Sequence, residues 1–391
     1  MAGGGVRHLR GQAHVLRPTA YGDVSWWERR RIPWRELGFR VVRVGRQWVY
    51  TSYERMVLLL APTQAGKTVT MANFLVDARG AAVATTTKVD LVDLTVAARV
   101  PIGPVYVFNP EQLGDGSDRY RSNLRWNPII GCEDPTEARQ RAANMVAGAR
   151  GMGGVGDREF WEGQAVRVLG AALHAAALGG ATMMDVLTWV SRPEDHDNEV
   201  RSMLRRSLAS EAMIENWSHL ASTNVATRTS ITTGVIPALE WLQDPTVAAV
   251  ALGAAEEQFD VAQFIREKGT LYLLANDREH GGVAPLFSAL VSAIFEQAKL
   301  LSTRQPGGRL DPGLSLTLDE VANMCPLPLH RIASDSAGRG ITMQLGFQSK
   351  AQMAWKWGEA AAQIIWDQAG LKLIFGGYSC RRGTCWCSCA G

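Results

Sequence analysis

The sequence predicts an α/β protein whose mostly parallel central sheet is interrupted by an all-α insertion. Apolar runs of strand length alternate with helical patterns over residues 56–108, and strand signals return over residues 269–375. Between these parts the chain is rich in alanine and carries apolar residues at helical spacing. Its 391 residues are 46% hydrophobic and 20% charged, which indicates a globular chain with a substantial core and excludes a disordered one.

The first part of the predicted sheet contains three apolar runs. Residues 56–60 precede a loop at 61–68 and then a helical pattern, so this segment reads as strand, loop and helix. A run at 80–86 precedes a helical pattern over 89–100, and a third run at 104–110 ends in proline. Strands that alternate with helices in this way form parallel sheets covered on both faces.

The middle and the second part of the chain follow a different pattern. No strand signal interrupts the helical spacing between residues 133 and 264, so an all-helical insertion is the simplest account. A helical stretch over 285–301 then separates the first two of the remaining strands. These strands are predicted at 269–275, 314–320, 341–348 and 371–375.

The loop after the first strand has the pattern of a phosphate-binding loop. Ala61 to Thr68 matches G-x4-G-K-[ST] except for alanine at the first glycine. Such a loop wraps a phosphate in consecutive backbone N–H groups at a helix N-terminus. Lys67 would neutralise the β and γ oxygens of the nucleotide, and Thr68 would offer its hydroxyl to Mg²⁺. The predicted nucleotide-binding residues are Thr63, Gln64, Ala65, Gly66, Lys67 and Thr68.

A pair of carboxylates follows the strand that begins at Leu314. A phosphate-binding loop needs an acidic residue at the end of a neighbouring strand, and Asp319 and Glu320 supply it. Asp319 would hold the Mg²⁺ shell, and Glu320 would polarise the attacking water. An acidic residue at a strand end is by itself weak evidence for a nucleotide site, since such residues also begin helices. The combination with the loop predicts ATP and Mg²⁺ as ligands.

Two further polar residues flank the strand that begins at Ile341. Gln348 ends this strand, where its amide would sense the γ-phosphate or orient water. Arg339 lies just before the strand and would reach the phosphate of a neighbouring subunit as an arginine finger. From spacing alone, a strand-end glutamine and a surface arginine are the favoured explanations of these two residues.

These motifs divide the chain into five predicted parts. Residues 1–55 are predicted to form a basic N-terminal arm with leading strands, and residues 56–132 the first part of a nucleotide-binding domain. Residues 133–264 would form the all-α insertion domain. Residues 265–378 would form the second part of the nucleotide-binding domain, and residues 379–391 an irregular cysteine-rich tail.

The N-terminal arm holds most of the excess positive charge. Residues 1–55 contain eleven arginines and four acidic side chains, although the whole chain has a formal net charge of only +3. Arg29 to Arg31 follow Trp26 and Trp27, an arrangement that suits phosphates or anionic lipid headgroups as well as a solvated arm. The longest apolar run that stands out, 165–178, contains an arginine and a histidine, so we expect no membrane span and a cytoplasmic chain.

The cysteines do not predict a metal site. Cys380, Cys385, Cys387 and Cys389 cluster in the tail with a C-x4-C-x-C-x-C spacing, which lacks the paired C-x2-C elements of zinc sites. The tail reads more like out-of-frame sequence than designed structure. We therefore expect a frameshift or premature truncation near residue 378.

Taken in order, these motifs resemble the type IV coupling proteins of conjugation and type IV secretion, the TraG/TraD-like group. The resemblance covers about Gly38 to Gly377. It is carried by residues 60–68, 87–95, 105–110, 125–129, 318–323, 338–341 and 348–352, and the ordered set is far more specific than any one member.

The resemblance implies a RecA-like nucleotide-binding domain interrupted by an all-α domain and assembled as a ring of six. It implies ATP-driven movement of DNA, expected to be single-stranded and bound without sequence preference, toward a type IV secretion channel. It assigns Lys67 and Thr68 to the nucleotide and Mg²⁺, Asp319 and Glu320 to Mg²⁺ and catalysis, Gln348 to γ-phosphate sensing and Arg339 to the trans finger. The all-α region would contact the relaxase or relaxosome.

Two departures from the family and two alternatives remain. Family members usually begin with transmembrane helices, so either this member is soluble or membrane association needs a missing or separate segment, with the chain at the cytoplasmic face of the membrane. After Phe375 the family normally continues with further sheet and helix, where this sequence has the cysteine-rich tail. One alternative function is an FtsK-like translocase of double-stranded DNA, against which the position of the helical insertion argues. The other is a truncated remnant that binds partners without catalysis.

Overall fold

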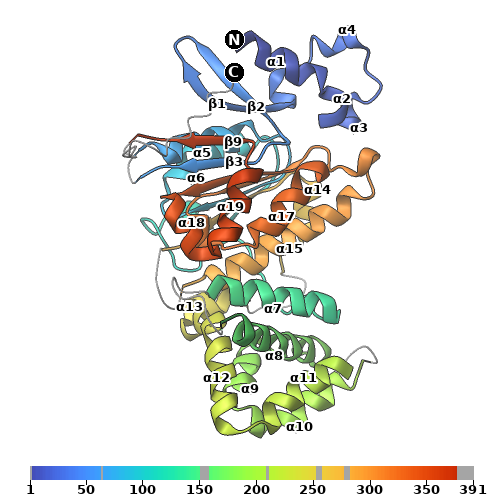
Figure 1. The fold of residues 1–391 in the computed structure, drawn as a ribbon, viewed down its shortest axis with the longest axis vertical. Coiled ribbons are helices and arrows are strands. Elements are labelled where there is room, and N and C mark those ends of the chain that lie inside the picture. The colour runs from blue at the N-terminus through green and yellow to red at the C-terminus, as the bar shows by residue number, and fades with distance from the viewer. Residues whose placement is uncertain are drawn as a thin grey trace.

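The computed structural model describes residues 2–62, 65–149, 158–207, 211–251, 258–276 and 282–376. The molecule is elongated, with a sheet and its covering helices in the centre and a helical region at one end of the long axis (Figure 1). At the other end lie a two-stranded hairpin and short helices from the N-terminal segment.

The central sheet has seven strands, all of them parallel, in the order β5-β6-β4-β7-β8-β3-β9. This sheet confirms the predicted fold class. Apart from the two edge strands, its residues are buried, as expected of parallel strands covered on both faces. The strand bounds are β3 Val57–Leu60, β4 Ala82–Thr86, β5 Val105–Phe108, β6 Thr270–Leu274, β7 Leu314–Leu318, β8 Ile341–Phe347 and β9 Leu371–Ile374.

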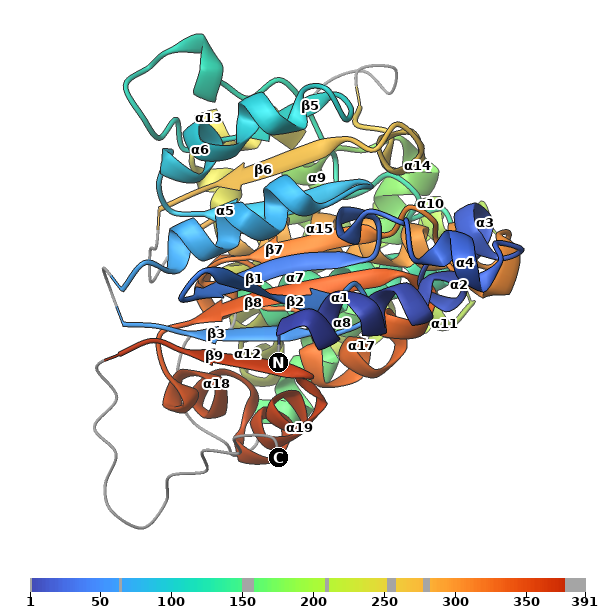
Figure 2. The ribbon, with the colours of Figure 1, turned by 90° about the horizontal axis from the view of Figure 1, so that it is seen from above.

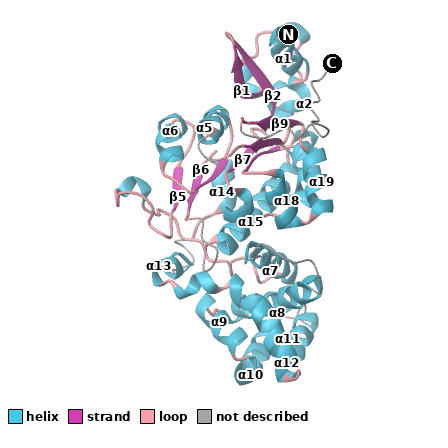
Figure 3. Cartoon of the chain, turned by 60° about the vertical axis from the view of Figure 1, so that its left-hand side comes forward, coloured by secondary structure: helices cyan, strands magenta, loops and turns pink. Residues whose placement is uncertain are grey.

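Alternate residues of each strand pack into different cores on the two faces of the sheet. Val57 and Leu59 of β3 join Phe74 in one core, whereas Leu58 and Leu60 join the other. The first face is covered by α5 (Lys67–Asp77) and α6 (Asp90–Arg99). The second is covered by the helices that follow β6, β7 and β8 (Figure 3). Their bounds are α15 Ala284–Ser302, α16 Val321–Met324, α17 Leu329–Ser336, α18 Lys350–Trp357 and α19 Glu359–Gln368.

Between β5 and β6 the regular elements of the described residues are all helical. They are α7 Pro135–Ala149, α8 Arg158–Gly179, α9 Met183–Ser191, α10 Pro193–Leu204, α11 Glu211–Ser222, α12 Val225–Val235, α13 Pro245–Ala248 and α14 Val261–Arg266, with short 3-10 turns between them. The apolar core of this region continues without a break into the core below the sheet. The division at residues 133 and 264 therefore stays a prediction about domains.

One helix of the described residues, α15, is long and apolar enough to cross a membrane by length and composition. The sequence predicted a helix here but not its resemblance to a membrane span. The apolar run expected to be the longest, residues 165–178, lies in α8 and is largely buried. Within its most apolar window α15 is 61% buried, and the helix packs against α7 and α14. A buried core helix can have the same composition as a membrane span. Because α15 is mostly buried against other helices, we assign it to the core.

The N-terminal segment folds as four short helices, a 3-10 turn and an antiparallel hairpin. The bounds are α1 Ala2–Gly11, α2 Ala13–Leu16, α3 Pro18–Tyr21, α4 Trp26–Arg29, β1 Gly38–Val44 and β2 Gln47–Ser52. Ion pairs fix this segment to the body: Arg17 Nε lies 2.6 Å from Asp311 Oδ1, and Arg40 Nη2 lies 2.7 Å from Asp77 Oδ1. Arg17 and Arg40 are therefore held by carboxylates of the body, whereas Arg30 and Arg31 behind the tryptophans are exposed.

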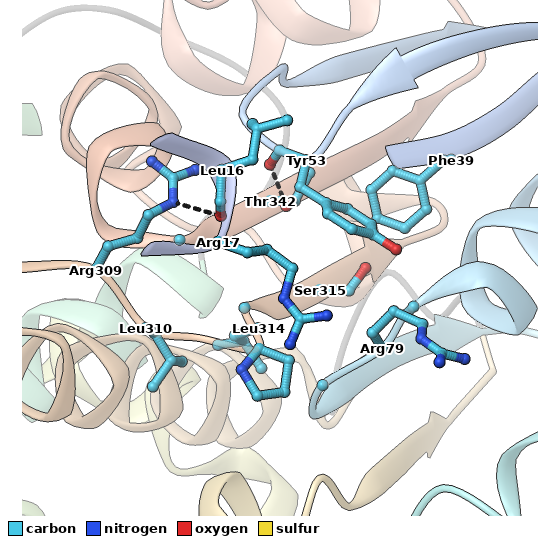
Figure 4. A pocket seen from close by; sticks show the side chains of 15 residues that line it. Leu16, Arg17, Phe39, Tyr53, Arg79, Arg309, Leu310, Leu314, Ser315 and Thr342 are labelled. Atoms are coloured by element: carbon cyan, nitrogen blue, oxygen red, sulfur yellow. Dashed lines mark hydrogen bonds between the residues drawn. The ribbon is translucent and has the colours of Figure 1, made fainter. Parts of the chain in front are cut away.

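A small pocket lies at the junction between the N-terminal segment and the sheet (Figure 4). Arg309 Nε donates to the carbonyl oxygen of Leu16 at 3.2 Å, and the hydroxyl of Thr342 donates to the carbonyl oxygen of Tyr53. Arg17 and Arg79 both pair with Glu36. The arginines of the pocket therefore hold the N-terminal segment against the sheet.

Arg99 is a fully buried guanidinium at the end of α6. It donates to the carbonyl oxygens of Leu75, Ala78 and Gly80 and to the hydroxyl of Thr270. Burial lowers the pKa of Arg99 to about 10, so the side chain still carries its charge at neutral pH. It therefore satisfies three carbonyl groups that α5 and the following turn leave open.

Replacement of Arg99 by methionine is expected to lower the free energy of unfolding by about 3 kcal/mol, because buried carbonyl oxygens lose their donors. Urea denaturation followed by circular dichroism measures this loss. Arg121→Met is the matched control, since the Arg121 side chain is 78% exposed and its removal should change stability little. Equal stability of the two variants would contradict the structural role of Arg99.

Candidate functional site

The first element of the site is the turn between β3 and α5. Gly66 has φ of 85° and precedes the first residue of α5, a left-handed conformation that suits glycine. A side chain at Gly66 would meet nothing within 4 Å, so the space above this turn is open. Lys67 and Thr68 then begin an 11-residue helix, whose free N–H groups favour an anion. Thr63 and Gln64 lie outside the described residues.

The second element is the turn after β7. Glu320 has φ of 47°, an uncommon conformation for a residue other than glycine, and non-glycine outliers of this kind cluster at functional sites. Its backbone N–H donates to Asp319 Oδ1 at 2.9 Å. The carbonyl oxygen of Asp319 accepts from the hydroxyl of Thr85, on β4, at 2.7 Å. The two carboxylates are thus held in place by the backbone of the turn and by the neighbouring strand.

Lys67 joins these two elements. Its Nζ atom lies 2.9 Å from Asp319 Oδ1 and 2.6 Å from Glu320 Oε1. All three side chains are largely buried. Burial by itself lowers the pKa of Lys67, but the two carboxylates outweigh it, so the net shift raises the pKa and the ammonium is retained. The Lys67 ammonium therefore lies between the carboxylates of Asp319 and Glu320 in a site that is largely shielded from solvent.

The sequence predicted that Asp319 and Glu320 follow a strand adjacent to β3, but they follow β7, which is not adjacent to β3. Strand β8 lies between β3 and β7, so Lys67 reaches across the end of β8 to meet Asp319. Gly346 of β8 makes this possible. A Cβ atom there would come within 2.6 Å of Asp319 Oδ1 and 2.8 Å of Met71 Cε. A side chain at this position would therefore displace the carboxylate.

Gln348 follows β8 and lies at the same edge of the sheet. Its Nε2 atom donates to Glu320 Oε2 at 3.2 Å, and its backbone N–H donates to Gln352 Oε1 at 3.0 Å. Glu320 thus has Lys67 on one carboxylate oxygen and Gln348 on the other. The strand-end glutamine is therefore in contact with the site.

Arg339 is the candidate residue that the fold does not bring to this place. Arg339 precedes β8, whereas Gln348 follows it, so the two residues lie at opposite ends of this strand. The length of a seven-residue strand separates them, roughly 20 Å. Arg339 Nε pairs with Asp335 Oδ1 at 2.9 Å. Any role for Arg339 in phosphate chemistry would have to concern a different subunit.

Sequence reasoning missed two residues that shape the site, Thr85 and Gly346. The glycine carries a usable signal, because an isolated glycine inside an apolar strand often marks the close approach of another group. Thr85 gives no comparable signal, since threonine is common in strands.

The donor set at this edge fits a nucleotide with its metal. Lys67 and the start of α5 present positive charge and N–H groups, as a phosphate requires. The hydroxyl of Thr68 and the carboxylate of Asp319 are the oxygen ligands that Mg²⁺ prefers. Groups of three or more histidine, cysteine or acidic side chains with metal-site geometry are absent from the described residues.

Comparison with solved structures gives matches to a bacterial conjugative coupling protein. The chain aligns with the unbound form of TrwBdeltaN70 with a TM-score of 0.55 and 16% identity, over 84% of this chain and 70% of the other. It aligns with TrwB in complex with ADP and Mg²⁺ with a TM-score of 0.54 and 16% identity, over 84% and 72%. For TrwB in complex with the ATP analogue ADPNP the TM-score is 0.56 at 16% identity, over 85% and 77%. At this identity the likeness concerns the fold.

No curated protein sequence matches the chain. A family model described as type IV secretory system conjugative DNA transfer matches residues 19–379. This match covers most of the sequence and includes every candidate site residue. The chain therefore belongs to the conjugative DNA transfer family of type IV secretory systems.

Proposed function

We propose that this chain hydrolyses ATP and uses the free energy to drive DNA through a type IV secretion channel. The observation that carries the proposal is the contact of Lys67 with both Asp319 and Glu320 at the carboxyl edge of a parallel sheet. Ligands of open α/β sheets bind at this edge. The family match and the nucleotide complexes of TrwB, a protein of the same fold, support ATP as the ligand.

Lys67, Thr68 and Asp319 would hold the nucleotide and its Mg²⁺. Bound Mg²⁺ would neutralise charge on the phosphates of ATP. Lys67 would exchange its two carboxylate partners for phosphate oxygens, which would leave Asp319 available as a ligand of the metal. Glu320, already hydrogen-bonded to Gln348, then accepts a proton from the attacking water, and Gln348 fixes the direction of that carboxylate. The remaining nucleotide-binding residues of the proposal are Thr63, Gln64, Ala65 and Gly66.

The proposed partners follow from the family. They are DNA, gripped through its phosphates without sequence preference, a relaxase or relaxosome, and the secretion channel. Membership of this family suggests a cytoplasmic or membrane-proximal location. A ring of six copies is the assembly we propose, with hydrolysis between adjacent subunits.

The direct test is phosphate release by the purified chain with ATP and Mg²⁺, alone and with single-stranded or duplex DNA. We expect hydrolysis that single-stranded DNA stimulates more than duplex DNA does. Stimulation by duplex DNA alone would favour an FtsK-like translocase. Absence of hydrolysis under every condition, with nucleotide binding retained, would leave only the partner-binding alternative.

Gly346 offers a test of the geometry that does not remove a charged group. Gly346→Ala should reduce hydrolysis roughly tenfold to a hundredfold, since the new methyl group displaces Asp319. Steady-state phosphate release and thermal unfolding of the same preparation measure it. Gly338→Ala is the control, because a Cβ atom there meets nothing within 4 Å. Unchanged hydrolysis in Gly346→Ala would contradict the assigned position of Asp319.

Arg339 is proposed as the finger that acts on the site of a neighbouring copy. Arg339→Ala and Lys67→Ala should each be inactive alone, and their mixture should regain part of the activity, because a mixed ring contains interfaces with both residues intact. Phosphate release as a function of mixing ratio measures this. A mixture as inactive as its components, with assembly unchanged, would contradict the trans role.

A further inference from the structure

The pocket beneath the N-terminal segment has positively charged walls that the proposed function does not use. Ser315 and Thr342 line it at the start of β7 and β8, at the opposite end of these strands from Lys67. Leu16 and Tyr53 line it from the N-terminal side (Figure 4). The view along the long axis shows the hairpin and α1–α4 in front of the central sheet (Figure 2). The pocket thus lies between two parts of the chain that are far apart in sequence.

Arg309 brings a buried guanidinium group to this pocket, since the residue is only 5% exposed. Its Nη1 atom donates to Glu54 Oε1 at 2.9 Å, and its Nε atom donates to the carbonyl oxygen of Leu16 at 3.2 Å. Its Nη2 atom is buried and has no hydrogen-bond partner among the described residues. A buried donor without an acceptor destabilises the folded chain, so Nη2 requires an acceptor from outside the chain.

The planar shape of the guanidinium group directs this free donor into the pocket. Nη2 lies on the same edge of the group as the Nε–H bond, whereas Nη1 lies on the other side. The Nε–H of Arg309 points at the carbonyl oxygen of Leu16, which is one of the lining residues (Figure 4). The Nη2 atom therefore faces the side on which Leu16 borders the pocket, and Nη1 faces Glu54.

The walls of the pocket carry positive charge without an acidic group. Among its described lining residues are Arg17, Arg79 and Arg309, and none is an aspartate or a glutamate. The carboxylates that pair with these arginines lie outside the lining; they are Glu36, Glu54 and Asp311. Burial lowers the pKa of Arg309 although Glu54 opposes this shift, so the charge of the guanidinium is incompletely compensated. An anion would satisfy both the donor and the charge, whereas a water molecule would satisfy only the donor.

The size of the pocket restricts the anion to a small one. Its volume of about 20 Å³ is enough for one water molecule or one monatomic ion. A phosphate group needs more room than this, so nucleotides and nucleic acid are excluded as ligands. Chloride is a monatomic anion that accepts hydrogen bonds from guanidinium groups.

We propose that this pocket binds one chloride ion, which accepts a hydrogen bond from Arg309 Nη2 and lies in the positive field of Arg17 and Arg79. Because Arg309 also holds the carbonyl oxygen of Leu16, the ion would strengthen the attachment of the N-terminal segment to the sheet. The proposal is independent of ATP hydrolysis, since the pocket lies away from Lys67 and its carboxylate partners.

Crystals of the full chain soaked in sodium bromide test the position of the ion, because bromide replaces chloride and scatters X-rays anomalously. We expect an anomalous peak within about 3.5 Å of Arg309 Nη2. A pocket that contains only water, or nothing, would overturn the proposal. This measurement uses the unmodified chain, so it does not depend on whether a variant folds.

Thermal unfolding at constant ionic strength, with glutamate exchanged for chloride, measures binding in solution. Chloride that binds only the folded chain should raise the Tm by about 2 °C at about ten times its Kd, and the rise should level off. Arg309→Gln should abolish this rise. Arg121→Gln should retain it as the matched control, because the Arg121 side chain is 78% exposed and lies outside the pocket.

Two results in solution would contradict the site. One is an equal effect of chloride on the unmodified chain and on Arg309→Gln. The other is a bromide peak without any effect of chloride on the Tm of the unmodified chain, which would identify an adventitious ion only. Neither measurement uses nucleotide or DNA, so the outcome does not depend on the proposed transport activity.

Discussion

ATP hydrolysis is expected to fall at least about a thousandfold when Lys67 is replaced by alanine, because the γ-phosphate loses its main positive partner in a largely buried site. Phosphate release at saturating ATP measures this loss. Lys372→Ala is the control, since Lys372 lies on β9 and donates to the carbonyl oxygen of Ala369 instead. Hydrolysis by Lys67→Ala within tenfold of the unmodified chain would contradict the assigned site.

The same substitution has a second consequence for the chain without nucleotide. Lys67 separates the carboxylates of Asp319 and Glu320, so its removal leaves two adjacent anions without a cation. Two largely buried like charges without a partner destabilise the folded chain. The midpoint of thermal unfolding of Lys67→Ala at neutral pH should therefore lie below that of the unmodified chain.

Glu320→Gln is expected to reduce hydrolysis by about a hundred to ten thousandfold while ATP still binds, because the amide has the shape of the carboxylate but cannot accept the proton of water. The ion pair of Lys67 with Asp319 remains in this variant. Affinity for a fluorescent ATP analogue, set beside single-turnover hydrolysis, separates the two effects.

Glu359→Gln on α19 is the matched control for Glu320→Gln, since Glu359 is exposed and lies outside the site. A variant Glu320→Gln that hydrolyses ATP normally would assign the proton acceptor to another residue. A variant that no longer binds ATP would show that Glu320 shapes the pocket rather than the chemistry.

The strands and the glycine turn before α5 were predictable because each leaves a local pattern. Each predicted strand of the sheet is present, and the residues that follow β3, β7 and β8 meet at one edge because parallel strands present their carboxyl ends together. The position of β8 between β3 and β7 was not predictable, since strand order depends on how connections cross the sheet. For the same reason the space that Gly346 provides was not foreseen.

The short N-terminal helices were not predicted either. Helices of four residues have no stable pattern of their own, since isolated helices of this length are unstable in water. They are held by contacts with residues far along the chain, such as the pair of Arg17 with Asp311. Information of this kind is absent from any local window of sequence.

Strand β8 begins just after Arg339 and ends just before Gln348, and it is hydrogen-bonded to a neighbour on each side. Hydrogen bonds to both neighbours make such a strand stiff, so a displacement at one end is carried to the other end. If both residues act as proposed, loss of the γ-phosphate next to Gln348 would shift the strand and, with it, Arg339 at its other end. The timing of hydrolysis around a ring would then be set by the stiffness of seven residues.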